Sequence, residues 1–399
     1  MDRLKGLFTQ TDQAETQFDL ATQIAITYFH QENERDSLIQ YLEIVLEVSN
    51  QFSQDEEKAK ICVNLANQCY WIRAFDHAAN LAGAAMKLTE DPEIVFAAHL
   101  IANVSSRPYL FYLEEEAVNC LCFLDSIAIY LDQISDPNLL SKYYAQKGMC
   151  AINNAKTIEG LNYLLKAEEL KQEEDCESVI LLTNIAAVYD ELEIFDKTVE
   201  LGLKAQKISQ RVENSCPETV STHAIISGAF ALKQYDLVKE NCQKALEFIE
   251  QKSNLEASKS YLYFLLGKVA IAESQYDLAN RYFQESLTIS KKFGYEDEVS
   301  QAYEGLSEVY FQKNDWILAK QYADLALEYT PPYISDRTFG FAQIYEKNEN
   351  YKKAYALLKD DVIKKAKRDS INNRSLIIST LLTENLEQEK AQFEQELAF

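Results

Sequence analysis

Two stretches of the sequence, YDLANRYFQESL at residues 276–287 and WILAKQYADLAL at residues 316–327, follow one pattern and begin 40 residues apart. Each starts with an aromatic residue, carries alanine three residues later, and has another small residue seven residues after that. Related stretches occur at four more places: FDHAANLAGAAM (75–86), FDKTVELGLKAQ (195–206), YDLVKENCQKAL (235–246) and YKKAYALLKDDV (351–362). The chain therefore contains an internal repeat.

A further small position lies twelve residues before the first small position of each copy. It is occupied by Ala66, Ala186, Gly267, Ser307 and Ala342, with Ile226 as the exception. Small residues on two facing helices let the helices approach closely, while the aromatic residue fills the gap beside the turn. The pattern predicts pairs of antiparallel helices.

These residues and their spacing resemble the tetratricopeptide repeat (TPR). The resemblance implies an all-α fold, a right-handed superhelical solenoid of about nine TPR-like helical hairpins, with a period of about forty residues where the family usually has about 34. We expect an N-terminal lead-in over residues 1–14, the solenoid over 15–362, and an extended C-terminal helix over 363–399. The repeat anchors fall at Leu38, Ala78, near Ala117, Gly160, Thr198, Val238, Ala279, Ala319 and Ala354.

Local signals for helix starts agree with this division. Ser53 and Glu56 have the spacing of a capping box, and the pairs Asp91-Pro92 and Asp136-Pro137 each place a capping acid before a proline at the first helical position. We therefore expect helices to begin at these three places.

The composition fits an all-helical protein with an acidic surface. The 399 residues include only ten Gly and six Pro, 47% are hydrophobic, and the formal net charge is −24. Nonspecific binding to nucleic acid or to an anionic membrane needs a cationic surface, so the charge argues against both. We expect no nucleic acid and no membrane among the partners.

The eight cysteines include no C-x-x-C pair, and Cys120 and Cys122 point to different faces of a helix. This pattern predicts free thiols that act as small core residues, which indicates a reducing compartment. The first twenty residues lack an apolar signal region, and no apolar stretch approaches about 18 residues. We expect a cytoplasmic protein.

No stretch of the sequence carries a catalytic motif. Gly267-Lys268 lacks the glycine that a phosphate-binding loop needs five residues earlier, and neither H-E-x-x-H nor G-x-S-x-G occurs. The four histidines are dispersed. We predict no active site, no metal and no cofactor within these residues.

The best candidates for function lie on the first helix of each pair, which lines the inner groove in the proteins that this sequence resembles. Asn side chains offer a donor and an acceptor, so Asn64, Asn103 and Asn184 predict a ladder for the backbone of an extended peptide. TPR receptors for signalling peptides resemble this pattern. The alternative is that these Asn residues tie neighbouring helices together. The other groove candidates are Lys60, Asn67, His99, Gln146 and Tyr144.

The last nineteen residues, LLTENLEQEKAQFEQELAF at 381–399, carry no helix stop signal. Apolar residues recur at the spacings of an imperfect coiled coil, which predicts a helix that pairs with a second copy in a homodimer. These relay positions are Ile378, Leu382, Leu386, Phe393 and Leu397, preceded by Ile371.

A solenoid followed by such a helix resembles the N-terminal sensor region of bacterial signalling proteins such as GGDEF diguanylate cyclases. The resemblance implies that the chain binds a peptide, a protein or a small ligand and relays the event to an output domain after Phe399. The alternative is a free-standing TPR scaffold or peptide receptor that mediates protein–protein interaction.

Overall fold

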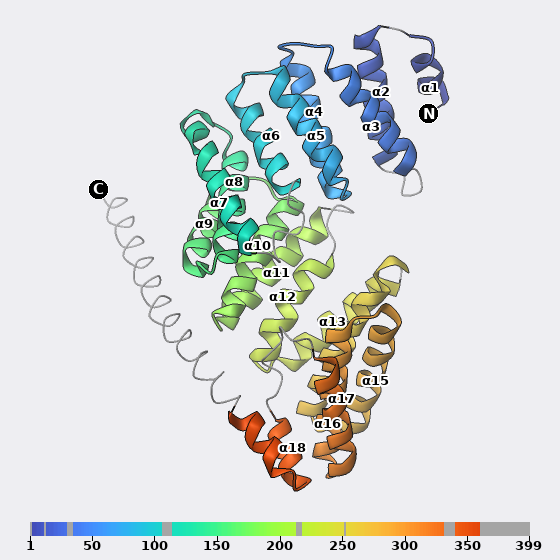
Figure 1. Cartoon of the computed structure of the whole chain (residues 1–399), viewed down its shortest axis with the longest axis vertical. Coiled ribbons are helices and arrows are strands. Elements are labelled where there is room, and N and C mark those ends of the chain that lie inside the picture. The colour runs from blue at the N-terminus through green and yellow to red at the C-terminus, as the bar shows by residue number, and fades with distance from the viewer. Residues whose placement is uncertain are drawn as a thin grey trace, which may run out of the picture. The chain divides into compact units, whose positions relative to one another are not determined.

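The computed structural model describes residues 2–11, 13–29, 35–105, 114–212, 218–250, 253–330 and 340–359. Within these ranges the regular elements are all helical, which confirms the predicted all-α class (Figure 1). The chain forms two compact units, residues 1–174 and 175–399. None of the helices in the described ranges is long and apolar enough to cross a membrane. The predicted C-terminal helix over 363–399 lies outside the described residues.

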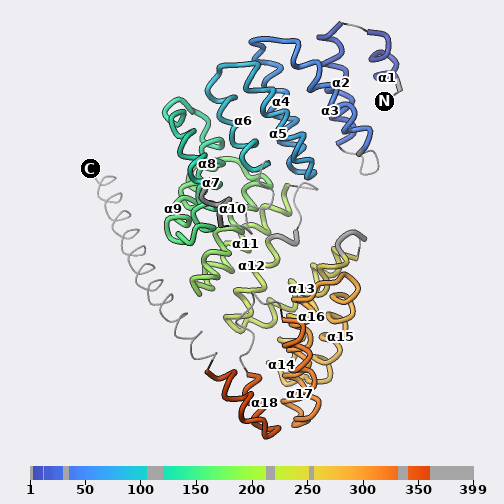
Figure 2. Tube along the Cα trace, in the orientation of Figure 1, coloured from blue at the N-terminus to red at the C-terminus, as the bar shows by residue number. Residues whose placement is uncertain are grey.

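The helices follow one another in antiparallel pairs, as the trace in Figure 2 shows. Unit 1 contains α1 (Asp2–Phe8) and the pairs α2 (Ala14–Phe29) with α3 (Arg35–Ser49), α4 (Glu56–Trp71) with α5 (Phe75–Leu88), α6 (Pro92–Ser105) with α7 (Glu114–Ile127), and α8 (Pro137–Asn153) with α9 (Thr157–Leu170). The 3-10 helix η1 (Ala128–Gln133) follows α7.

Unit 2 continues the same alternation of first and second helices. Its pairs are α10 (Cys176–Glu191) with α11 (Phe195–Arg211), α12 (Glu218–Ala231) with α13 (Tyr235–Glu250), α14 (Lys259–Ala272) with α15 (Tyr276–Phe293), α16 (Glu296–Gln312) with α17 (Trp316–Tyr329), and α18 (Phe341–Lys347) with the helical residues 351–359. The 3-10 helix η2 (Ser253–Ser258) precedes α14. Several second helices also pack on the first helix of the next pair, as α11 does on α12 and α15 on α16.

The turn inside the pairs has a recurring geometry. A residue in the left-handed region lies two positions before the first residue of the second helix, as Glu193 (φ 59°) does before Phe195. The amide N–H that follows it, that of Ile194, donates to the carbonyl of Tyr189 at 2.8 Å and ends the first helix with a bond across six residues. None of these left-handed residues is glycine: Arg73, Ala155, Glu193, Lys233, Ser274, Asn314 and Glu349.

The small residues of the repeat lie where the two helices of a pair come closest. A Cβ added to Gly148 of α8 would lie 2.8 Å from the carbonyl oxygen of Gly160 on α9. A Cβ on Gly267 of α14 would lie 2.6 Å from the ring of Phe283 on α15. At these two positions an added methyl group does not fit without a shift of its neighbours, and this close approach agrees with the small residues found at the other repeat positions.

A second recurring contact joins the start of a first helix to the end of its partner. The hydroxyl of Ser300 donates to the carbonyl of Ala326 at 2.8 Å, and Ser141 makes the same bond to the carbonyl of Ala167 at 2.6 Å. Ser260 donates likewise to the carbonyl of Ser286. Each bond spans 26 residues and is buried. The serine therefore adds a buried bond between the two helices of a pair, on a carbonyl that also accepts from its own side of the pair, as the Ala167 carbonyl does from the Lys171 amide at 3.1 Å.

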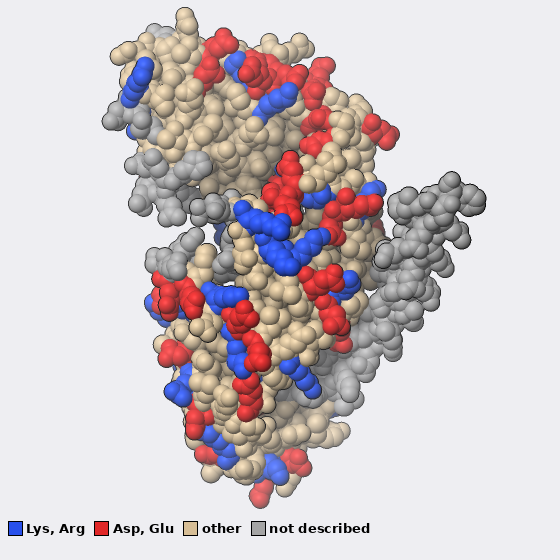
Figure 3. Space-filling model, turned by 180° about the vertical axis from the view of Figure 1, so that it is seen from behind, with Lys and Arg blue, Asp and Glu red and all other residues tan. Residues whose placement is uncertain are grey.

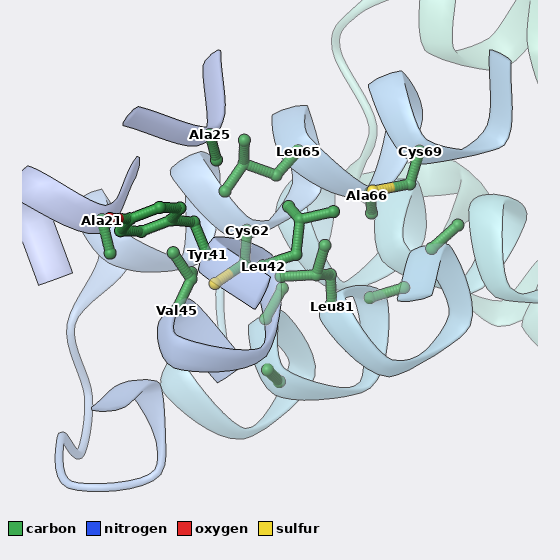
Figure 4. Packing of buried hydrophobic residues seen from close by; sticks show 14 of the residues in the cluster. Ala21, Ala25, Tyr41, Leu42, Val45, Cys62, Leu65, Ala66, Cys69 and Leu81 are labelled. Carbon is green, nitrogen blue, oxygen red and sulfur yellow. The ribbon is translucent and has the colours of Figure 1, made fainter. Parts of the chain in front are cut away.

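The core of each unit is a row of apolar layers between successive pairs. In unit 1, residues from α2 to α5 interdigitate, as Figure 4 shows for Tyr41, Leu42, Leu65 and Leu81. In unit 2 the core around α14 to α18 is built on Phe283 and Tyr345, both fully buried, with small alanines between them. Burial of these stripes is the main stabilising contribution, since a single pair cannot cover its own apolar faces.

The helix starts confirm two of the three predicted caps. The Asp91 carboxylate accepts from the amide of Ile94 at 3.0 Å, and the Asp136 carboxylate from that of Asn138 at 2.9 Å. The prediction at Ser53 is wrong, because the helix α4 is capped by Asp55, whose carboxylate accepts from the amide of Lys58 at 3.1 Å. A carboxylate directly before the first helical residue replaces the capping box expected from the Ser53 spacing.

The prediction that all the cysteines are free thiols is also wrong. A disulfide joins Cys120 of α7 to Cys150 of α8, with their Cα atoms 6.0 Å apart, and Cys176 is disulfide-bonded as well. The separation of 30 positions between Cys120 and Cys150 gave no spacing signal, because the packing of two helices brings the two sulfurs together. Cys62, Cys69 and Cys242 are free and buried, as expected, and Cys122 is free and exposed.

Candidate functional site

The three Asn residues of the predicted ladder lie in three different environments. Asn64 on α4 is exposed, Asn184 on α10 is half-buried, and Asn103 on α6 is buried at 3% exposure. Asn103 and Asn64 belong to unit 1 and Asn184 to unit 2. A continuous groove through all three stays a prediction.

Asn103 ties two first helices together. Its Nδ2 atom donates to Oε1 of Gln146 on α8 at 3.2 Å and lies 3.7 Å from the Cys120 sulfur. Gln146 in turn donates from Nε2 to the carbonyl of Leu100 on α6 at 3.3 Å. Asn103 and Gln146 both lie two residues before the small position of their helix, Ser105 and Gly148. For this residue the structure favours the helix-tying alternative.

The other candidates of unit 1 form two groups. Lys60 is exposed and pairs with Glu56 one turn earlier, Nζ to Oε1 at 2.6 Å, and Asn67 lies half-buried on the same helix α4. His99 on α6 is half-buried, and burial lowers its pKa. Its ring stacks on Tyr130 with centroids 6.4 Å apart.

Tyr144 belongs to a cation–aromatic cluster between α8 and α9. Its ring stacks on Tyr163 at 6.2 Å, and the Lys166 ammonium lies 4.1 Å from the Tyr144 ring centroid. Lys147, one turn after Tyr143, lies over the Tyr163 ring at 5.1 Å and bonds Asp125 at 2.8 Å. Stacked rings with paired lysines supply apolar contact area with polar edges.

Unit 2 carries a row of polar side chains that the sequence predictions passed over. We call it the first-helix row, and it consists of Asp190 on α10, His223 and Ser227 on α12, Tyr261 and Lys268 on α14, and Glu308 on α16. Five of these side chains are half-buried and His223 is exposed. All six come from first helices.

Each neighbouring pair of first helices contributes one contact to the row. The Ser227 hydroxyl donates to the Asp190 carboxylate at 3.0 Å, and the His223 ring lies 5.0 Å from the ring of Tyr261. Lys268 Nζ bonds Glu308 Oε2 at 2.7 Å. These contacts link α10 to α12, α12 to α14 and α14 to α16, with Tyr261 and Lys268 seven residues apart on α14.

The environment of the row alters its titrating groups. His223 has a solvent-exposed edge, but the surrounding side chains desolvate the imidazole and lower its pKa, while the Asp190 carboxylate opposes this shift. Burial raises the pKa of Tyr261 to about 12, so the phenol stays a hydrogen-bond donor at neutral pH. The first-helix row therefore presents hydrogen-bond donors and hydrogen-bond acceptors next to one another.

Three residues of the first-helix row share a position in the sequence repeat, which is a signal that the sequence alone contains. Ser227, Lys268 and Glu308 each directly follow the small position of their helix, at Ile226, Gly267 and Ser307, and Asn67 follows Ala66 in the same way. The three Asn residues of the predicted ladder, Asn64, Asn103 and Asn184, lie two residues before that position instead. In α16 that earlier position is Gly305, which faces Phe283 of the preceding pair rather than solvent.

No group of three or more metal-binding side chains occurs in the described ranges. Lysine and acidic side chains are interspersed on the face drawn in Figure 3, with wide uncharged areas between them. This mixed surface agrees with the sequence argument against a cationic surface for nucleic acid.

Comparison with solved structures gives helical-repeat proteins. The chain is similar to the apo form of RapI (TM-score 0.59, 15% identity, covering 83% of this chain and 98% of that one). It is also similar to the apo form of the quorum sensor NprR from B. thuringiensis (0.55, 17%, 82% and 99%) and to a Rap protein complexed with Competence and Sporulation Factor (0.54, 15%, 84% and 99%).

At these identities the likeness establishes the TPR-like helical-repeat fold and nothing finer. The sequence matches no family model, and comparison with curated proteins gives no match. The resemblance to GGDEF proteins gains no support from the solved structures.

Proposed function

We propose that this chain is a regulatory TPR region that binds a peptide or a segment of a protein on the exposed side of its first helices. The observation that carries the proposal is the first-helix row, in which consecutive helices present a carboxylate, an imidazole, a phenol and an ammonium side by side. An extended peptide needs alternating donors and acceptors along its length, and this row offers both.

The similar solved structures support the same class of ligand. One of them is a Rap protein complexed with Competence and Sporulation Factor, and another is named a quorum sensor. Those proteins share the fold of this chain over most of its length. The groove residues that we propose in unit 1 are Lys60, Asn64 and Asn67 on α4 and His99 on α6. Asn103 and Gln146 tie α6 to α8, and Asn184 and Tyr144 remain candidates.

The relay belongs to the proposal as well. Residues 378–397 carry the apolar positions Ile378, Leu382, Leu386, Phe393 and Leu397, and we propose that they pass a ligand-induced change to a signalling output domain such as a diguanylate cyclase. The gene sequence directly after Phe399 tests this version: a GGDEF or histidine kinase motif there would support it, and its absence would favour the scaffold. A free-standing scaffold or peptide receptor is the second candidate, and the shared fold fits it equally.

Selection of phage-displayed random heptapeptides on the immobilised chain, followed by calorimetry of the selected peptide, tests the binding site. Lys268→Met breaks the contact with Glu308 and should weaken the peptide's affinity at least about tenfold, an effect of about 1.4 kcal/mol. Lys244→Met is the matched control, because Lys244 makes a similar ion pair with Glu240 on the second helix α13. Equal affinities for both variants would contradict the proposed site.

The dimeric relay is tested by molecular mass in solution, for the full chain and for a version ending at Arg368. A dimer for the full chain and a monomer for the shorter one is the expected result. Monomers in both cases would remove the relay dimer and leave the scaffold.

A further inference from the structure

The last described helix, residues 351–359, exposes a large apolar face. Tyr351 is 64% exposed, Tyr355 70% and Leu358 52%, and these residues recur at helical spacing on one side. Ile317 at the start of α17 is 69% exposed too. Contiguous exposed apolar patches of this kind mark interaction surfaces.

The repeat itself shows that this face is unusual. Leu358 lies four residues after the small position Ala354, and its counterparts in six other second helices are fully buried. Those counterparts are Leu42, Ala82, Leu164, Cys242, Phe283 and Ala323, all with 0% exposure. Leu358 differs from these six residues, because 52% of it is exposed.

The reason the others are buried is visible in unit 2. A Cβ on Gly305 of α16 would collide with the ring of Phe283, so the first helix of the next pair covers Phe283. Likewise, a Cβ on Gly202 of α11 would lie 2.8 Å from Ile225 of α12. The position of Leu358 is therefore built to be covered by a following first helix.

We propose that residues 371–385 of this chain are that covering helix. In unit 2 the small residue of the next first helix follows that of the preceding second helix by 23 residues (Ala319 to Ala342) to 29 residues (Val238 to Gly267). Counting from Ala354, this interval spans 377–383 and contains Ser379. Ser379 takes the place that Ser307 has in α16.

The apolar residues of this segment then fall on the buried positions of a first helix. In α16 the residues one, two and eight positions before Ser307 are Leu306, Gly305 and Val299, all buried. At the same offsets from Ser379 stand Ile378, Ile377 and Ile371. Ile377 and Ile378 thus cover Leu358, as Gly305 covers Phe283 and Ile225 faces Gly202.

The connection is long enough for this arrangement. Eleven residues, 360–370, separate the described helix from the segment, and eleven residues span far more than the ~10 Å between packed helices. The inference does not rest on the proposed function. It competes with the proposed relay for Ile378 and Leu382, which it assigns to the end of unit 2, and it leaves Leu386, Phe393 and Leu397 for a relay.

Cysteine cross-linking in the full chain tests the contact. In a Cys122→Ser background, Leu358→Cys combined with Ile378→Cys should form an intramolecular disulfide on treatment with diamide, which accepts the two electrons and two protons of the thiols. Peptide mapping identifies the bond. The control pairs Leu358→Cys with Phe393→Cys, which should stay reduced. Helical circular dichroism confirms that each variant is folded.

Two other results would overturn the proposal. A covalent dimer formed on mixing the two single-cysteine variants shows that a second copy covers the face instead. Absence of any cross-link, with amide exchange of residues 351–359 unchanged in a chain ending at Arg368, shows that residues 371–385 do not cover it. Peptide affinity measured on the same variants separates this failure from a failure of the proposed binding site.

Discussion

The side-chain amide of Asn103 on α6 donates to that of Gln146 on α8 at 3.2 Å, although 43 residues separate them. Both residues hold the same place in their repeats, two residues before the small position of the first helix. Equivalent positions of consecutive repeats are thus bonded directly, and a polar residue that suggested a ligand from its sequence pattern is part of the scaffold.

Replacing Asn103 by alanine should lower the stability of unit 1. The change leaves the buried end of Gln146 without this partner, at a cost of about 1–2 kcal/mol. Asn64→Ala on the exposed side of α4 is the control and should change stability by less than about 0.5 kcal/mol. Urea unfolding followed by circular dichroism measures both. Similar losses for the two variants would contradict the distinction between scaffold and surface.

The close contact at Gly267 predicts a large effect of one methyl group. Gly267→Ala places a Cβ 2.6 Å from the Phe283 ring, which is fully buried, so we expect a loss of about 1–3 kcal/mol. At Gly83 in the helix α5 nothing lies within 4 Å of the added Cβ. Gly83→Ala should therefore raise stability by about 0.5–1 kcal/mol, because alanine favours the helix. Thermal melts compare the two, and a gain at Gly267 would refute the close packing.

Glu298 on α16 predicts a pH-dependent stability. Burial raises its pKa above the usual value, although hydrogen bonds from Ser260 and Ser290 oppose the shift. The folded state therefore holds the proton more tightly than the unfolded chain, and the stability this provides is present below about pH 4.5 and lost as the pH rises through the folded pKa.

Glu298→Gln removes the charge and keeps a hydrogen-bonding side chain. We expect Tm to rise by about 1–3 °C at pH 7 and to change little at pH 4. Glu296→Gln on the exposed start of the same helix is the control and should give no such gain. An equal rise at both pH values would mean that ionisation of Glu298 is not the cause.

The cysteines should differ sharply in reactivity. Burial raises the pKa of Cys62, Cys69 and Cys242 to about 12, so their thiolates are scarce, whereas Cys122 is exposed. Iodoacetamide should label Cys122 in the native protein without reductant, and the buried three only after unfolding. Mass spectrometry of the peptides identifies which cysteines are labelled. Labelling of Cys120 before reduction would show that its disulfide with Cys150 is not formed.

The repeat could be found in the sequence because it depends on local chemistry. Aromatic residues such as Phe195 and Trp316, and small residues such as Ala279, recur at fixed distances, since every pair solves the same packing problem with the same kind of side chain. The all-α class, the pairing of helices and the caps at Asp91 and Asp136 follow from that periodicity and from single residues.

Contacts between pairs were decided by tertiary structure. The disulfide from Cys120 to Cys150, the bond from Ser227 to Asp190 and that from Lys268 to Glu308 join residues 30 to 40 positions apart. Their formation depends on how one first helix is rotated against the next, and composition and spacing within a helix do not fix that rotation. By itself the sequence determined which residues form each helix and which side is buried. Only the packing of consecutive pairs decided which polar side chains meet, because those partners come from different repeats.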